Sequence, residues 1–136
     1  MKKYILIAGV NGAGKSTLYQ TLESLKNMTR INTDEIVRSF GNWQNTSDVF
    51  KAGKIAVKKM KEYFDQGITF NQETTLCGAS IIQNIKFAKS LGYKIELHYV
   101  TWLFYMIIRR ALIALQYIKR ASFSMWLIID RVGIMN

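Results

Sequence analysis

The sequence predicts a three-layer α/β fold in which helices flank a mainly parallel sheet. Two observations carry this prediction. Strand-like and helix-like segments alternate along residues 1 to 100, a pattern typical of parallel sheets, and a glycine-rich segment separates the first predicted strand from the first predicted helix. The 136 residues include no proline and no linker-like stretch. We therefore expect a single domain over residues 1–136.

The first predicted elements are a strand, a loop and a helix. Residues 4–8 form a short apolar run closed by Gly9, which reads as a strand. The segment after the glycines has leucines at helical spacing, namely Leu18, Leu22 and Leu25. Residues 30–32 are interpreted as the end of a second, short strand.

The next four elements continue the alternation. Apolar residues recur every three or four positions over residues 47–65, and Gly67 is suited to end this helix. A β-branched strand is expected over 68–75, a helix over 78–91, and an alternating strand over 93–100.

The character of the sequence changes after Val100, where tryptophan, methionine and isoleucine become frequent. We expect an amphipathic helix at about 104–120 and a short strand at about 125–129. Apolar runs here fall short of the roughly 18 residues that a membrane-spanning helix needs. A helix lying at a membrane surface is the less favoured alternative, and we expect no membrane partner.

Charge and cysteine content narrow the classes of partner. The net charge of +10 fits an anionic ligand, but lysines within residues 51–61 read as the solvated face of a helix, without a motif that reads nucleic acid. Nucleic acid is therefore the less favoured partner; a basic nucleic-acid binder would show binding that weakens steeply with salt and does not depend on Lys15. The lone Cys77 cannot form an internal disulfide, which indicates the reducing cytoplasm. The lone His98 falls on the polar face of a predicted strand, and we expect no catalytic role for it.

Residues 9–16 match the phosphate-binding pattern G-x-x-x-x-G-K-[ST] between a strand and a helix. In this P-loop, successive backbone N–H groups and the positive end of the helix dipole bind phosphate oxygens. Lys15 is expected to reach the β- and γ-phosphates and Ser16 to bind magnesium, with Thr17 as a supporting donor. The predicted nucleotide-binding residues are Gly9, Asn11, Gly12, Ala13, Gly14, Lys15, Ser16 and Thr17.

The rest of the sequence favours a kinase over a switch GTPase. No Asn-Lys-x-Asp segment is present to read guanine, and no Asp-x-x-Gly follows the second predicted strand. The predicted fold is thus a kinase-like P-loop NTPase that uses ATP and Mg²⁺ to phosphorylate a small hydroxyl-bearing substrate.

Such a kinase needs a carboxylate near the acceptor hydroxyl. Asp34 and Glu35 follow the second predicted strand, at the sheet edge where α/β proteins bind ligands. Together with Arg38 they are candidate substrate-binding residues. The alternative for Asp34 is a helix N-cap with Arg38 as a surface partner. Glu73, Thr74 and Thr75 end the next strand and could hold a sugar or another polyol, although a solvated strand end would have similar residues.

Taken together, several segments resemble the zeta toxin family of P-loop kinases. They are residues 9–17, 31–35, 52–54, 70–78 and 92–93. The resemblance implies ATP-dependent phosphorylation of UDP-N-acetylglucosamine, in many members as the toxin partner of an antitoxin. It implies Lys15 and Ser16 on nucleotide and magnesium, Asp34 as the base, and substrate contacts from Glu73 and from Thr74 or Thr75.

The sequence departs from the family pattern in residues 101–136. Family members usually have arginines on a helix and then a Gly-Gly-His segment over the phosphates. Here Tyr117 stands at one arginine position, Arg120 matches the other and is the expected catalytic arginine, and no Gly-Gly-His segment follows. The alternative hypothesis is therefore a truncated or frameshifted member that binds ATP without transferring phosphate.

Overall fold

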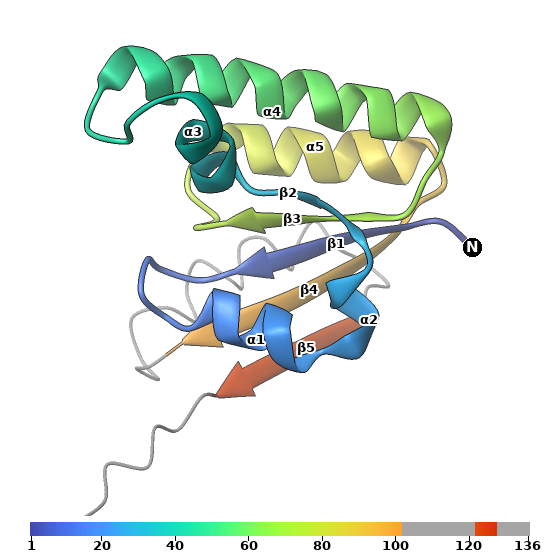
Figure 1. Ribbon diagram of the computed structural model, residues 1–136. Helices are drawn as coiled ribbons and strands as arrows, with labels where there is room; N and C mark the ends of the chain where they lie inside the picture. Colours follow the sequence, from blue (N-terminus) through green and yellow to red (C-terminus); the bar gives the residue numbers. More distant parts are fainter. Residues whose placement is uncertain (102–121, 128–136) are drawn as a thin grey trace, which may run out of the picture.

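The computed structural model describes residues 1–101 and 122–127, which contain one five-stranded sheet (Figure 1). The strand order is β2-β3-β1-β4-β5, and every pairing between neighbours is parallel. The predicted parallel α/β architecture is confirmed. The strands are β1 Lys3–Ala8, β2 Thr29–Ile31, β3 Phe70–Thr74, β4 Lys94–Thr101 and β5 Ser122–Leu127.

Helices cover both faces of the sheet, as the three-layer prediction requires. In Figure 1, α3, α4 and α5 lie on one side of the sheet and α1 and α2 on the other. Alternate β1 side chains enter two separate cores: Leu6 packs in the cluster that includes Phe64 of α4, whereas Ile7 packs with Leu18 of α1. The helices are α1 Lys15–Thr21, α2 Glu23–Lys26, α3 Thr33–Phe40, α4 Thr46–Gln66 and α5 Ala79–Ser90.

The first predicted helix is two short helices. Leu22 lies between α1 and α2 with extended backbone angles, φ −90° and ψ 104°, so the helical spacing of the three leucines does not reflect one continuous helix. Leu18 and Leu25 are nevertheless both buried in the same core. A bent segment can bury two apolar residues in one core as well as a straight helix can.

The longest helix, α4, matches its prediction closely. Asn45 begins it as the N-cap, its side chain accepting from the Ser47 N–H, and Gly67 ends it with φ 66°. Its buried residues recur at every fourth position, at Ala52, Ala56, Met60 and Phe64. Among the described helices, none combines the length and apolar character needed to cross a bilayer.

The predicted helix at 104–120, including Arg120, lies outside the described residues. The predicted strand at 125–129 overlaps β5, which begins three residues earlier, at Ser122.

The topology creates a ligand position at the carboxyl end of β1. The chain leaves β1 into α1 on one face of the sheet, and it leaves β2 and β3 into α3 and α5 on the other face. The central strand β1 is flanked by β3 and β4. In α/β sheets, the crevice where connections diverge to opposite faces is where ligands bind.

Candidate active site

The phosphate loop connects β1 to α1 at this crevice. Its glycines at 9, 12 and 14 have φ of +153°, +79° and +91°, conformations that favour glycine over residues with a Cβ. A Cβ on Gly9 would lie 2.4 Å from the Val100 carbonyl oxygen of β4. The loop can therefore pass against β4 only because this position is glycine.

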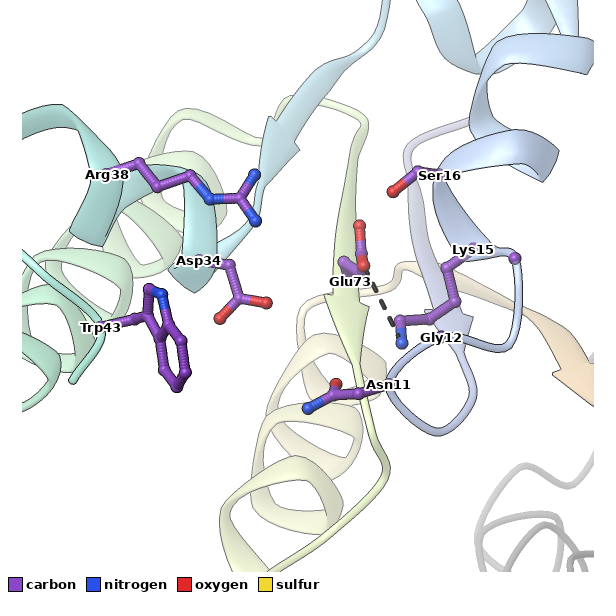
Figure 2. Close-up of a pocket in the computed structure, with 9 residues that line it drawn as sticks. Asn11, Gly12, Lys15, Ser16, Asp34, Arg38, Trp43 and Glu73 are labelled. Carbon is purple, nitrogen blue, oxygen red and sulfur yellow. Dashed lines mark ion pairs between the residues drawn. The ribbon is translucent and has the colours of Figure 1, made fainter.

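Lys15 begins α1 and lies across the loop. Its side chain is 7 % exposed, and its Nζ donates to the carbonyl oxygens of Gly9 at 2.8 Å and Val10 at 2.9 Å. The same Nζ lies 3.9 Å from Oε1 of Glu73 on β3 (Figure 2). The ammonium is thus fixed between the loop backbone and a carboxylate.

A cavity of about 510 Å³ opens between the loop and α3. In Figure 2, Lys15, Ser16 and Gly12 lie on one side of it and Asp34, Arg38 and Trp43 on the other, with Glu73 between them. A second cavity of about 270 Å³ shares part of this lining and extends to Thr74 and Thr75. The lining of the larger cavity consists of Asn11, Gly12, Gly14, Lys15, Ser16, Asp34, Arg38, Trp43 and Glu73.

Glu73 is held by side chains from β2 and the residue after it. The Arg30 guanidinium forms an ion pair with Oε2 of Glu73, and Asn32 Nδ2 donates to the same oxygen at 2.9 Å. Arg30 also contacts Glu35 at 2.8 Å and lies 4.0 Å from the centre of the Tyr19 ring. This network joins β2, β3, α1 and α3 around one carboxylate.

Asn32 also forms the N-cap of α3. Its Oδ1 accepts from the N–H groups of Asp34 at 2.9 Å and Glu35 at 3.3 Å, which satisfies two donors of the first helical turn. The alternative role of Asp34 as the N-cap is therefore wrong. The Asp34 carboxylate instead lines the cavity.

The structure brings most predicted site residues together, but not all of them. Glu35 forms its ion pair with Arg30 and lines neither cavity. Within the loop, the lining also omits Gly9, Ala13 and Thr17. Asp34, Arg38, Glu73, Thr74 and Thr75 all line one or both cavities.

The strand end after β3 has an uncommon backbone. Thr74 Oγ1 accepts from the Leu76 N–H at 3.0 Å, and Leu76 has φ 58°, which is uncommon for a residue with a Cβ. The Thr74 hydroxyl thus shapes the turn besides lining the smaller cavity. His98 lies on β4 outside both linings, where burial lowers the pKa of its imidazole and Glu96 opposes part of the shift.

Sequence reasoning missed five residues of this site: Arg30, Asn32 and Trp43, together with Thr33 and Gln72 in the lining of the smaller cavity. An N-cap rule applied to residues 32–35 could have found Asn32. Arg30 meets Glu73 across 43 positions of sequence, and Trp43 lies in a loop between two helices. No local pattern marks either of them.

Comparisons with known proteins agree with the fold. The zeta toxin family model matches residues 1–103. An uncharacterized protein of Haemophilus influenzae is 34% identical over 98 residues, which cover 72% of this chain and 69% of that protein.

Two solved structures share the architecture. One, from the PezAT chromosomal toxin-antitoxin system of Streptococcus pneumoniae, has a TM-score of 0.61 at 19% identity, covering 85% of this chain and 53% of that chain. The other, a candidate kinase from Chloroflexus aurantiacus, has a TM-score of 0.63 at 12% identity, covering 95% and 89%. This chain therefore spans about half the length of the pneumococcal one.

Proposed function

The chain belongs to the zeta toxin family, and we propose that it is an ATP-dependent kinase that phosphorylates a hydroxyl of a sugar nucleotide such as UDP-N-acetylglucosamine. One observation carries the proposal: a single cavity has the phosphate loop on one side and the Asp34 carboxylate on the other. A phosphoryl group held by the loop would therefore face a potential base across the same space.

The donor side fits ATP with magnesium. The loop lines the cavity with glycines, which have no side chain between the backbone and a ligand, and Lys15 supplies a cation in the same lining. Ser16 Oγ would hold Mg²⁺, which neutralises charge on the β- and γ-phosphates when bound. Mg²⁺ commonly takes its remaining ligands from phosphates and water. A site of this kind does not need a cluster of three or more acidic, histidine or cysteine side chains, and the described part of the chain contains no such cluster.

The acceptor side supplies the base and the orientation. Asp34 would accept the proton of the substrate hydroxyl while the hydroxyl oxygen forms a bond to the γ-phosphorus and ADP leaves. Glu73, fixed by Arg30 and Asn32, would accept hydrogen bonds from substrate hydroxyls. Thr74 and Thr75 extend the polar lining beside it, and Glu35 would act by holding Arg30.

The family also supports two proposals about context. We propose a protein antitoxin as partner, because the pneumococcal relative comes from a toxin-antitoxin system. We propose the cytoplasm as the location, because the single cysteine excludes an internal disulfide.

A second candidate function is ATP binding without transfer. It is favoured by the sequence after Val100, where Tyr117 occupies an expected arginine position and no Gly-Gly-His segment occurs. Arginines that neutralise transition-state charge contribute about 10³-fold or more to the rate in related phosphoryl transfers.

ADP release from magnesium ATP, with and without UDP-N-acetylglucosamine, separates these functions. The kinase predicts sugar-dependent release that Asp34→Ala and Lys15→Ala abolish. Asp65→Ala and Lys61→Ala are the matched controls, because both residues lie on the exposed face of α4. ATP binding that requires Lys15, without sugar-dependent release, would instead establish the second function.

A further inference from the structure

Trp43 combines high exposure with a position on the cavity wall. Its side chain is 67 % exposed, yet it lines the cavity together with Asp34 and Arg38. In Figure 2 the indole lies beside Asp34, across the cavity from Lys15. A large aromatic surface left open to water at a cavity is a common feature of ligand sites, because a bound ring can cover it.

Hydrogen bonds fix the backbone that carries this indole. The Asn42 N–H donates to Asp48 Oδ2 at 3.0 Å, and the Gln44 N–H donates to Asn42 Oδ1 at 2.9 Å. At Gly41, a Cβ would lie 2.5 Å from the same Asp48 oxygen. Trp43 is thus held in place by its neighbours in the loop between α3 and α4, so its exposure reflects an ordered loop.

Arg38 adds a cation next to the indole. Its side chain is exposed, and it forms no ion pair with any side chain in residues 1–101 whose contacts the structure describes. A guanidinium of this kind is well suited to bind phosphate through two parallel N–H groups. An apolar ring surface and a phosphate-binding cation therefore lie on one wall, on the side of Asp34 away from the phosphate loop.

We propose that Trp43 and Arg38 form the acceptor subsite, in which the indole stacks on a ring of the substrate and the guanidinium binds a phosphate of the same substrate. The proposal rests on the kinase function and defines its acceptor class as a ring linked to phosphate, not a free sugar. The ring is either the nucleobase or the sugar, since both stack on indole.

Phe50 supplies a matched comparison on the same part of the molecule. It is 65 % exposed, near the start of α4, and the Lys54 ammonium lies 4.6 Å from its ring centre. It lines neither cavity of the site. Exposure alone therefore does not distinguish the two aromatic residues, whereas their position relative to Asp34 does.

Calorimetric titration of the full chain without ATP tests the subsite independently of turnover. Trp43→Ala is expected to weaken binding of UDP-N-acetylglucosamine about 10-fold or more, as the loss of one stacked ring does elsewhere. Trp43→Phe should stay within about 3-fold because it keeps a stacking face. Phe50→Ala should leave the affinity unchanged, and thermal melting should show Trp43→Ala folded.

Titrations with parts of the substrate identify which ring stacks on the indole. If Trp43→Ala weakens the binding of UDP but not of N-acetylglucosamine 1-phosphate, the indole stacks on the base. The reverse result assigns the indole to the sugar. Arg38→Ala should weaken both phosphate ligands about 10-fold and leave uridine unaffected.

Three results would overturn the subsite. They are no binding of UDP-N-acetylglucosamine to the wild type, an affinity for it that Trp43→Ala leaves unchanged, or a Trp43→Ala variant that loses as much affinity for magnesium ATP as for UDP-N-acetylglucosamine. Binding with the expected Trp43 dependence but without phosphate transfer would retain the subsite and reject the kinase.

Discussion

The two walls of the cavity are built in different ways. The donor wall is one continuous segment, residues 9–16, whose backbone conformation at three glycines defines its shape. The acceptor wall joins side chains from separate segments, as in the contacts of Arg30 and Asn32 with Glu73 over 43 and 41 positions. Backbone shape is encoded locally, whereas a side-chain network exists only once the sheet has formed.

This difference predicts that the two walls can be damaged separately. A change in the loop should affect ATP and leave the acceptor bound, because the loop does not depend on α3 for its shape. A change in the α3 region should do the reverse. Two contacts join the walls in the described part of the chain: the Gly9 N–H donates to the Thr74 carbonyl oxygen at 3.1 Å, and Lys15 Nζ lies 3.9 Å from Oε1 of Glu73. Neither contact involves α3, so we expect weak coupling between the loop and the α3 region.

Lys15→Ala should have the largest effect and should break the donor wall alone. We expect kcat/KM for ATP to fall about 10³-fold, because the substitution removes the cation that offsets charge on the transferred phosphoryl group. Calorimetry without ATP should find UDP-N-acetylglucosamine binding within about 3-fold of the wild type. Equal losses for both ligands would show that the walls form one unit.

Asp34→Asn should break the acceptor wall with a slightly smaller effect. The amide keeps the shape of the carboxylate but cannot take the proton, so kcat should fall about 10²- to 10³-fold. The affinity for magnesium ATP, measured by calorimetry, should not change. Asp65→Asn on the outer face of α4 is the control, and an unchanged kcat in Asp34→Asn would exclude Asp34 as the base.

Asn32→Asp tests whether the network around Glu73 matters apart from helix capping. Aspartate keeps the cap oxygen of α3, but it replaces the amide that donates to Glu73 at 2.9 Å with a second negative charge. We expect the KM for the acceptor to rise about 10-fold and the melting temperature to fall, because two carboxylates in contact at a largely buried position repel each other.

The matched variant Asn32→Ala removes both contacts of the side chain. It should lower the free energy of unfolding by about 1 kcal/mol or more, through loss of the cap and of the hydrogen bond to Glu73, which urea denaturation would measure. If Asn32→Asp were as active as the wild type, the contact with Glu73 would have no role in positioning.

The same contrast explains how far the sequence predicts this molecule. The phosphate loop, the succession of strands and helices around it and the bounds of α4 follow from local signals: a glycine spacing, an apolar periodicity, and Gly67 as a helix stop. The break at Leu22 does not, because two short helices bury Leu18 and Leu25 as well as one long helix would. Arg30 and Trp43 gain their neighbours only through tertiary packing, so the acceptor wall was predicted only in part.

Asp48 should give the smallest effect, and it separates positioning from contact. Its Oδ2 accepts from the Asn42 N–H at 3.0 Å, and it does not line the cavity itself. Asp48→Ala should therefore free the loop that carries Trp43 and raise the KM for UDP-N-acetylglucosamine about 3-fold, with the KM for ATP unchanged. Asp48→Asn retains an acceptor oxygen and should restore the wild-type value, since a neutral hydrogen bond is enough to hold the loop. Steady-state kinetics of the two variants would decide the matter. If both variants were impaired alike, the charge at the start of α4 would be the relevant property. If both matched the wild type, the loop would owe its order to the caps at Asn42 and Asn45 alone.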